Sequence, residues 1–544
     1  MNKLHPKKVL LIEDDHGWIN DFKEWFKLSQ CLIDGDGSSF QQILQDSCDI
    51  DLVLIDFDLG ADRPTGDIIL RKIRDLNPNM CIGLFSGIQH HGFSAADTQF
   101  SDFYSNKETF LDRTEAFKDV IHHWSSFMKD RCSPNISTEW GHLKTVLVHT
   151  PGTELQYVDV EDSNYLMEER PDVERAAEEH KNFIATLRKT SQSTVLEIRD
   201  LLEDVFKMYD QEKDRELLLA KILFDDDEFS FYQMLRKVSM DYPHLCTQAI
   251  EDVKHLEPKE VVQFIYEGWN SANWSRYQNA FKNKHVAFLL EMNNAYFTRD
   301  PGFTLDGLFV TSNMTKKIRK REARVLDLVL RNHPWLKGTT LSSFARRGGS
   351  HRIEGGDVIA IGPKQLAVGW SERTSLSTIK ALASDLIIEH DYEEVFAIPI
   401  PERRAFMHLD TVFSLVGGQT ALVYPEAIEA QVGFFSITRA PTGSEDGIEI
   451  KANEHSFLKY LEQKRGMRII QTAGGHVGSA VVEQFTDATN CFAIGDGKVV
   501  SYKGNKKTNE ALSKAGIEVI TVEGYELVKG RGGPRCMTMP ISRE

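Results

Sequence analysis

Short apolar runs that end in a polar side chain alternate with helical stretches in the first third of the chain, and this alternation most constrains its fold. Lys8–Ile12, Asp51–Asp56 and Met80–Phe85 are strand-like, a further strand is expected from Phe103 to just before Lys107, and helical stretches such as Thr65–Leu76 lie between and after them. Strands that alternate with helices form a parallel sheet, whose ligand site lies at the carboxyl ends of the strands. We therefore predict a doubly wound (βα)5 domain over residues 1–128.

Side chains suited to phosphoryl transfer gather at the predicted strand ends. Glu13, Asp14 and Asp56 supply carboxylates, Ser86 a hydroxyl and Lys107 an ammonium group. Clustered carboxylates repel one another and need a cation, and oxygen ligands suit Mg²⁺. A carboxylate beside Mg²⁺ can attack phosphorus, while the hydroxyl and the ammonium hold the phosphoryl oxygens.

This ordered set resembles the receiver domain of two-component response regulators. The resemblance implies a bound Mg²⁺ and a phosphodonor, either a histidine kinase or a small molecule. The alternative is an acidic strand-end cluster that is never phosphorylated. The roles implied by the resemblance are phosphoacceptor for Asp56, metal ligands for Glu13, Asp14, Asp56 and Asp58, and switch residues for Ser86, Tyr104 and Lys107.

Composition excludes several classes of partner. The 544 residues include 64 Lys and Arg against 81 Asp and Glu, a net charge of −17, which argues against nucleic-acid binding. No apolar run approaches the roughly 20 residues needed to cross a membrane, and Val9–Ile12 is too short for a signal peptide. Seven cysteines without a Cys-x-x-Cys pair favour a reducing compartment. We therefore expect a cytoplasmic protein with no membrane partner.

A second region follows a short joint. Residues 129–138 are rich in Pro, Ser and Asn and are predicted to form a linker. Residues 139–544 open with a strand at Leu143–Val148, continue as a helical stretch over about 165–285, and then return to strand runs separated by Gly-rich turns. This second α/β region is predicted to carry a separate site.

Five motifs of the second region hold the residues of a thiol-based reaction. Cys536 is a candidate nucleophile and His408 a candidate proton shuttle. A thiol becomes nucleophilic when positive charge lowers its pKa, and Arg531, Arg535 or a cationic substrate would supply that charge. The five motifs are Asn294–Asp300, Ile318–Glu322, Ile353–Asp357, Met407–Asp410 and Lys529–Met537.

The carboxylates of these motifs have two possible ligands. A metal ion is one, because His, Asp and Glu are metal ligands, but no second histidine accompanies His408 at ligand-like spacing. A planar cation is the better interpretation, since a guanidinium offers a fork of N–H donors that matches carboxylates. Gly355 and Gly356, between Glu354 and Asp357, permit close backbone approach.

The motifs resemble those of the arginine deiminases, in the guanidino-group-modifying (pentein) superfamily, from about Leu143 onward. The resemblance implies a pseudo-fivefold α/β propeller with a helical bundle inserted over about 165–285. Ser163–Pro171 departs from the family pattern and would line the pocket mouth. The implied roles are nucleophile for Cys536, general acid and base for His408, support of His408 for Glu354, guanidinium binding for Asp300 and Asp410 with Asp357 beside them, binding of the α-carboxylate end for Asn294, Arg319 and Arg373, and gating for Arg531.

The implied reaction is hydrolysis of L-arginine to L-citrulline and ammonia through a covalent thiouronium on Cys536, without a cofactor for this step. The receiver would regulate activity or assembly, and both families lead us to expect a homo-oligomer. One alternative is an arginine sensor whose output is a partner interaction. Another is a deiminase for a different guanidino compound, such as agmatine, but agmatine lacks the carboxylate that Arg319 and Arg373 would bind.

Overall fold

The structure is a computed structural model that divides into two compact units by its internal contacts. Unit 1 comprises Met1–Ser133 with Arg188–Thr194, and unit 2 comprises Pro134–Leu187 with Val195–Glu544. The division after Ser133 falls inside the predicted linker. The structure describes residues 8–12, 19, 30–34, 39, 52–56, 69, 72–73, 81–86, 103–106, 133–156, 158, 160, 166–208, 218–219, 221–222, 256–270, 287–289, 291–333, 335–336, 340–344, 351–428, 433–441 and 447–544.

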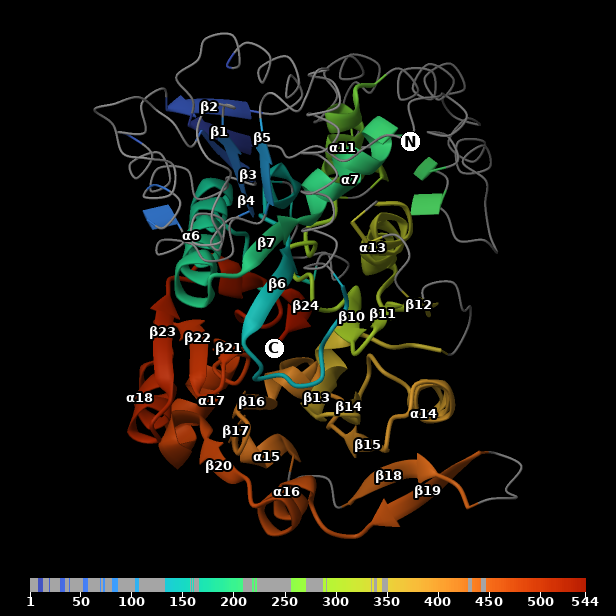
Figure 1. Cartoon of the computed structure of the whole chain (residues 1–544). Coiled ribbons are helices and arrows are strands. Elements are labelled where there is room, and N and C mark those ends of the chain that lie inside the picture. Colours follow the sequence, from blue (N-terminus) through green and yellow to red (C-terminus); the bar gives the residue numbers. More distant parts are fainter. Residues whose placement is uncertain are drawn as a thin grey trace. The chain divides into compact units, whose positions relative to one another are not determined.

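Unit 1 contains a five-stranded parallel sheet (Figure 1). Its order is β2-β1-β3-β4-β5, the order of one common class of doubly wound domains. The four strands whose positions the sequence pattern gave are confirmed, whereas β2 was not located because its apolar run has only three residues. The strands are β1 (Lys8–Ile12), β2 (Gln30–Asp34), β3 (Leu52–Asp56), β4 (Cys81–Ser86) and β5 (Phe103–Asn106).

Unit 2 repeats one strand connection. Four antiparallel pairs are each followed by helix and then by a third strand that runs parallel to the second. The pairs are β10–β11 (Gly302–Leu305, Leu308–Thr311), β13–β14 (Val358–Gly362, Gln365–Trp370), β16–β17 (Phe413–Gly417, Thr420–Val423) and β21–β22 (Phe492–Gly495, Lys498–Tyr502). The third strands are β12 (Thr340–Ser343), β15 (Glu394–Pro399), β20 (Arg468–Gln471) and β23 (Glu518–Val522).

The fifth sheet joins distant parts of the sequence. Strand β24 (Met539–Arg543) pairs antiparallel with β6 (Leu143–Val148), the strand predicted to open this region, and β7 (Thr194–Glu197) lies on the other side of β6. Strands β18 (Phe434–Arg439) and β19 (Ile448–Asn453) extend the sheet of β13, β14 and β15. The described part of the chain therefore shows a mixed α/β fold in which five sheets share a similar order.

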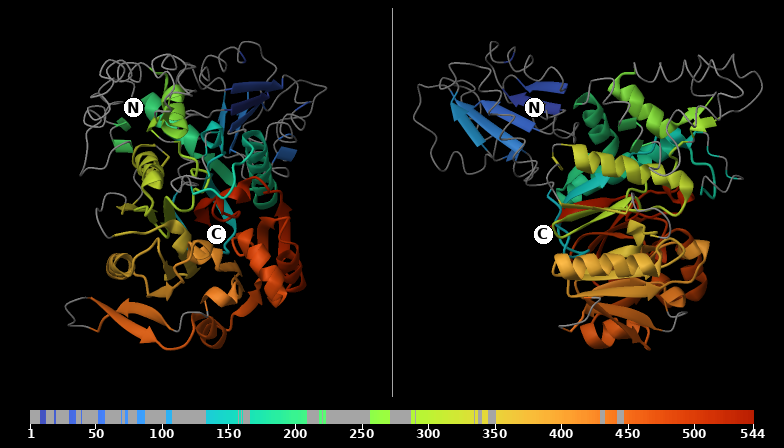
Figure 2. Two further views of the ribbon diagram at one scale, coloured as in Figure 1. Left: turned by 180° about the vertical axis from the view of Figure 1, so that it is seen from behind. Right: turned by 90° about the vertical axis from the view of Figure 1, so that its right-hand side faces the viewer.

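The helices have recognisable ends. Helix α14 (Leu376–Glu389) begins after Ser375, whose Oγ accepts a hydrogen bond from the backbone N–H of Thr378. Helix α16 (Phe457–Arg465) begins after Ser456 in the same way and ends at Gly466, whose φ of 63° suits glycine. These two helices and α18 (Lys506–Lys514) lie toward the periphery of unit 2 in Figures 1 and 2. Helix α13 (Lys320–Asn332) follows β11.

The predicted helical stretch contains strands as well as helices. Helices α6 (Val173–Ser191), α7 (Ile198–Met208) and α11 (Pro258–Glu267) lie in it. Strand β7 interrupts them, because residues 194–197 carry a β-branched pair that suits the sheet. Helix α6 therefore connects β6 to β7, as α14 connects β14 to β15. Among the described residues, no helix is long and apolar enough to span a membrane.

Aromatic side chains from separate elements form part of the core of unit 2. Phe457 of α16 lies 5.3 Å from Phe434 of β18 and 5.7 Å from Phe396 of β15, measured between ring centroids. Its side chain is 2% exposed. Because the rings join a helix to two strands of a neighbouring sheet, their removal should loosen the packing between repeats.

Phe457→Ala should therefore lower the stability of unit 2 by about 3–5 kcal/mol, the usual cost of removing a buried aromatic ring. Tyr525→Ala is the control, because Tyr525 is 67% exposed and its loss should cost less than about 1 kcal/mol. Thermal unfolding followed by circular dichroism measures both. Equal midpoints for the two variants would contradict this description of the core.

Candidate active site

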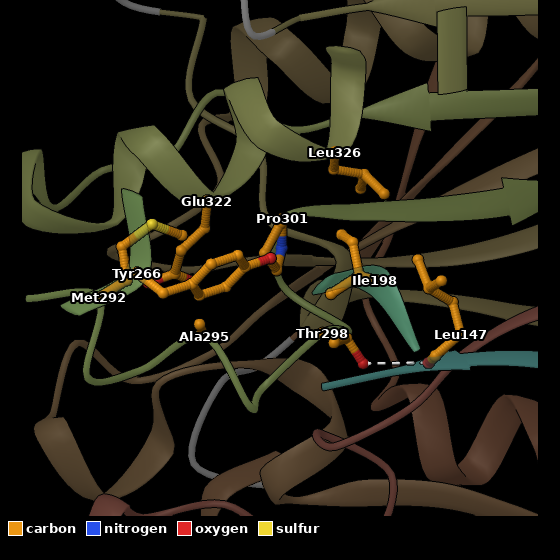
Figure 3. A pocket seen from close by; sticks show the side chains of 9 residues that line it. All are labelled: Leu147, Ile198, Tyr266, Met292, Ala295, Thr298, Pro301, Glu322 and Leu326. Atoms are coloured by element: carbon orange, nitrogen blue, oxygen red, sulfur yellow. Dashed lines mark hydrogen bonds between the residues drawn. The ribbon is translucent and has the colours of Figure 1, made fainter. Parts of the chain in front are cut away.

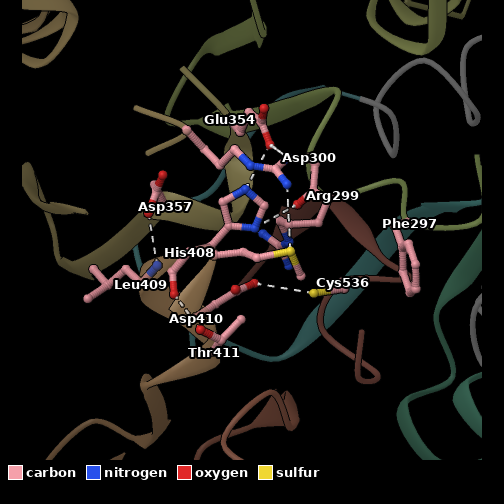
Figure 4. A network of polar contacts seen from close by, with 12 residues as sticks. Phe297, Arg299, Asp300, Glu354, Asp357, His408, Leu409, Asp410, Thr411 and Cys536 are labelled. Carbon is pink, nitrogen blue, oxygen red and sulfur yellow. Dashed lines mark hydrogen bonds and ion pairs between the residues drawn. The ribbon is translucent and has the colours of Figure 1, made fainter. Parts of the chain in front are cut away.

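The predicted site residues stand in loops that immediately precede the first strand of a sheet. Asp300 lies two residues before β10, and Glu354 precedes a short 3₁₀ turn, η3 (Gly355–Asp357), that leads into β13. His408 precedes a similar turn, η5 (Leu409–Thr411), before β16. Cys536 lies three residues before β24. Repetition of the fold thus brings residues from distant motifs to one place (Figure 4).

His408 is held between carboxylates. Its Nε2 lies 2.8 Å from Oε2 of Glu354, and its Nδ1 lies 3.6 Å from Oδ1 of Asp300. Burial alone lowers the pKa of His408, but the carboxylates of Asp300 and Glu354 outweigh it and raise the pKa to about 9. A Cβ on Gly356 would lie 2.6 Å from Nδ1 of His408, so the predicted close approach at this glycine is confirmed.

Asp300 and Asp410 each accept hydrogen bonds through one oxygen only, among the residues that the structure describes. Oδ2 of Asp300 accepts from Nη1 of Arg319 at 2.5 Å, and Oδ2 of Asp410 accepts from Nη1 of Arg535 at 2.7 Å. Among the described residues, neither Oδ1 atom has a hydrogen-bond partner, although both atoms are buried. A buried carboxylate oxygen without a donor is costly, so the two Oδ1 atoms are acceptors suited to a cationic ligand.

The Cys536 thiol lies beside these carboxylates. Its Sγ is 3.8 Å from Oδ2 of Asp410, and its backbone N–H donates to Oδ1 of Asn490 at 2.9 Å. Burial raises the pKa of Cys536 well above its usual value, and the charges of Asp410, Asp300 and Asp487 raise it further. The thiol is therefore protonated at neutral pH while no cation is bound.

Arg535 lowers the pKa of the Cys536 thiol, as the sequence predicted, but burial and the aspartates keep that pKa raised. Arg535 opposes the rise but is outweighed, because its guanidinium is shared between Asp410 and Glu139. Arg531 lies with its guanidinium carbon 4.2 Å from the centroid of the Phe485 ring, and its φ of 62° marks a left-handed backbone.

The arginines predicted to bind a substrate carboxylate are paired with protein carboxylates. Besides Asp300, Arg319 donates from Nε and Nη2 to Glu322, with contacts of 2.7–3.1 Å, and from Nη2 to the carbonyl oxygen of Asn294 at 3.4 Å. Arg373 donates from Nη1 to Oε2 of Glu354 at 3.3 Å. Buried guanidinium groups need such partners, and the role of both arginines toward a substrate carboxylate stays a prediction.

Asp357 has a supporting position. Its Oδ1 accepts from the backbone N–H of Leu409 at 2.9 Å, and its Oδ2 accepts from Oγ of Ser371 at 2.7 Å. Burial raises the pKa of Asp357 to about 6. The residue predicted to lie beside the substrate therefore anchors the turn that follows His408.

A small pocket opens among these side chains. Glu354, Asp357 and Asp410 do not line the pocket. Glu354 contacts His408 and Asp410 contacts Cys536, which both line it, and Asp357 contacts Leu409, the neighbour of His408. Leu166 comes from the segment predicted to line the pocket mouth. The lining residues are Leu166, Asn294, Phe297, Asp300, Arg319, Arg373, Met407, His408, Thr411, Gly530, Arg531 and Cys536.

A second pocket is mainly apolar (Figure 3). Its walls include Tyr266, Met292 and Leu326, and the carboxylate of Glu322 also lines it. Glu322 is the same residue that binds Arg319, so its charge is already paired. The second pocket is therefore lined by Glu322, the residue that holds Arg319 in the wall of the first pocket.

Three residues of the site offer atoms at metal-binding separation. One ligand atom each from Asp300, Glu354 and His408 lie within 4.8 Å of one another, and this is the one such group among the described residues. The pKa of His408 is raised to about 9, so a metal ion would have to displace a proton from its imidazolium. The charge pattern thus favours a hydrogen-bonded cation over a metal ion.

Sequence reasoning missed three residues of the site. Asn490, in the loop before β21, holds Cys536 and also donates from Nδ2 to the carbonyl oxygen of Asp410 at 3.3 Å. Glu322 stood in a quoted motif without a role, and Glu139 stood just after the linker. The repeat itself is the signal for Asn490. Site residues precede the first strand of four sheets, and Asn490 lies in the corresponding loop of the fifth sheet, just before β21.

The predicted receiver residues are only partly described. Asp56 ends β3 and Ser86 ends β4, the adjacent parallel strand, while Tyr104 lies in β5. These are backbone positions, and nothing is described of their side chains. Four further predicted residues lie outside the described part of the chain: Glu13, Asp14, Asp58 and Lys107.

Comparison with known proteins assigns the family. The family model described as arginine deiminase matches residues 163–543. The arginine deiminase of Clostridium perfringens is 32% identical over 424 residues, which cover 77% of this chain and 100% of the relative. That of Treponema denticola is 33% identical over 422 residues, 75% of this chain and 98% of the relative. The chain belongs to the arginine deiminase family.

Proposed function

We propose that the chain hydrolyses free L-arginine to L-citrulline and ammonia. The observation that carries this proposal is the pair of buried Oδ1 atoms on Asp300 and Asp410, beside the Cys536 thiol. A guanidinium group would supply N–H donors to both aspartates and place its central carbon near the sulfur. The arginine deiminases that match this chain over nearly their whole length support the same substrate.

The first half of the reaction begins with charge exchange. A bound guanidinium offsets the carboxylates that keep Cys536 protonated, so the thiol releases its proton as the cation binds. The Cys536 thiolate then attacks the guanidinium carbon and forms a C–S bond. His408, an imidazolium at neutral pH, protonates the terminal amino group, and ammonia leaves. A thiouronium remains on Cys536.

The second half consumes water. The neutral His408 takes a proton from a water molecule, whose oxygen attacks the thiouronium carbon. The C–S bond breaks, L-citrulline leaves, and His408 and Cys536 return to their starting states. Asp300 and Asp410 stabilise positive charge throughout both halves. We propose that Arg319, Arg373 and Asn294 hold the amino-acid end of the substrate and that Arg531 closes over it.

Purified protein should release citrulline and ammonia from L-arginine, whereas Cys536→Ala should lower the rate by at least about 10⁴-fold, because the nucleophile is lost. Cys491→Ala is the matched control, since Cys491 is also buried but lies outside the pocket. Agmatine should react at least about a hundredfold less efficiently than arginine. Arginine binding without turnover would instead support the sensor alternative.

Glu354→Gln should lower the pKa of His408 from about 9, because it removes one carboxylate that favours the imidazolium. In the native chain the protonation of His408 stabilises the fold fully below about pH 6.5 and is lost as pH rises through about 9. Histidine-selective NMR titration, assigned with His408→Asn, measures the shift. Glu372→Gln is the control, since Glu372 pairs with Lys316 and not with His408.

We propose further that unit 2 is a pseudo-fivefold propeller with a helical insertion and that unit 1 is a phosphorylatable receiver. The five similar sheets support the first statement. The sheet order of unit 1, with Asp56 and Ser86 at adjacent strand ends, supports the second. Mg²⁺ at the acidic strand ends would assist phosphoryl transfer to Asp56, and a histidine kinase or small phosphodonor would supply the group. Phosphorylation would change the activity or homo-oligomeric assembly of the enzyme.

Acetyl phosphate with Mg²⁺ should therefore change either the rate or the molar mass of the native chain and leave Asp56→Asn unchanged. The reason is that the substitution removes the acceptor oxygen. Asp51→Asn, which changes another aspartate of the same sequence segment, is the control and should respond as the native chain does. Light scattering and citrulline release measure the two outcomes. A native chain indifferent to acetyl phosphate in both assays would reject the regulatory role.

A further inference from the structure

The first residues of unit 2 are bound into its fold. The backbone N–H of Asn135 donates to the carbonyl oxygen of Ile541 at 3.0 Å, and that of Arg543 donates back to Asn135 at 2.9 Å. The backbone N–H of Glu139 donates to the carbonyl oxygen of Ala360 at 3.1 Å. Residues 135–139 are therefore held in place beside β24, the strand that follows the nucleophile.

This segment delivers a buried carboxylate to two arginines. Oε1 of Glu139 accepts from Nη2 of Arg535 at 3.0 Å, and Oε2 accepts from Nε of the same guanidinium at 3.3 Å. Nη1 of Arg299 lies 3.8 Å from Oε1. Glu139 is 7% exposed, and both arginines are buried as well. The contact is thus poorly screened by solvent.

The far edge of the same guanidinium reaches the reacting groups. Arg535 donates from Nη1 to Oδ2 of Asp410 at 2.7 Å, and it directly precedes Cys536 in the chain. Arg299 directly precedes Asp300. Two positive charges therefore adjoin the aspartates that must attract a cation, and Glu139 offsets one of them.

We propose that Glu139 is a positioning residue of the deiminase reaction, which holds Arg535 against Asp410 and removes excess positive charge from the guanidinium site. This inference rests on the proposed function. Without the Glu139 charge, the net charge of the group that Glu139 forms with Arg299, Arg535, Arg543 and Asp410 rises by one unit. The free site then repels the substrate cation and stabilises the Cys536 thiolate.

Glu139→Gln in the full chain should produce two effects of opposite sense. The KM for L-arginine should rise about tenfold or more, because the substrate meets an uncompensated guanidinium. The rate at which iodoacetamide alkylates Cys536 should rise about tenfold at a fixed pH below the thiol pKa, since that pKa falls. Mass spectrometry of the Cys536 peptide separates this thiol from the other six cysteines.

Matched variants distinguish positioning from simple stabilisation. Asp327→Asn also neutralises a buried carboxylate paired with an arginine, Arg331, and should lower the melting temperature without either effect. The double variant Glu139→Gln with Arg299→Gln restores charge balance and should return KM and alkylation toward native values. If Glu139→Gln alone does not fold, the double variant is compared with Arg299→Gln alone, and the difference between these two gives the effect of Glu139.

The results that would overturn the role of Glu139 differ from those that would overturn the proposed deiminase reaction. Native KM and native alkylation rates in a folded Glu139→Gln chain would show that Glu139 only stabilises the fold and would overturn the inference. A loss of charge rescue in the double variant would do the same. If the native chain turns over no arginine, the proposed function fails, yet the alkylation rates still report whether Glu139 controls the charge at Cys536.

Discussion

The site depends on the partial pairing of two buried aspartates. Each accepts from a protein arginine through one oxygen, Arg319 for Asp300 and Arg535 for Asp410, and among the described residues the other oxygen accepts no hydrogen bond. Full pairing would leave nothing to attract a substrate, whereas an unpaired buried carboxylate would be too costly to keep ionised. The protein arginines thus fix the aspartates in place and leave one acceptor on each for a second guanidinium.

The repeated fold makes this arrangement possible. Each loop that precedes the first strand of a sheet brings one or two polar side chains to the same place, and several supporting contacts run from one loop to another. His408 depends on Glu354 of another sheet, and Cys536 depends on Asn490 of a third. Because each member is held by a different repeat, displacement of one sheet would disturb the residues of its neighbours.

Much of this could be predicted from the sequence. Strand-like runs predicted four of the five strands of unit 1, and the motifs predicted Asp300, Glu354, His408, Asp410 and Cys536 through their resemblance to the arginine deiminases. The pairing of Arg319 with Asp300 and the raised pKa of the thiol could not be predicted, since both arise from burial and from distances across the fold. The roles of Glu139 and Asn490 could not be predicted either, because they depend on partners that are distant in the sequence.

The pairing of β24 with β6 has a consequence for synthesis of the protein. Arg543 of β24 pairs with Leu143 of β6, 400 residues earlier in the sequence. Asn135 is hydrogen-bonded to Arg543 over a separation of 408 residues. Such long-range closure is slow, because chain entropy is lost before the contacts form. A chain still emerging from the ribosome holds four of the site's loops before it holds the nucleophile. The thiol is therefore the last of these side chains to be synthesised, and a nascent chain that ends before Cys536 has no nucleophile.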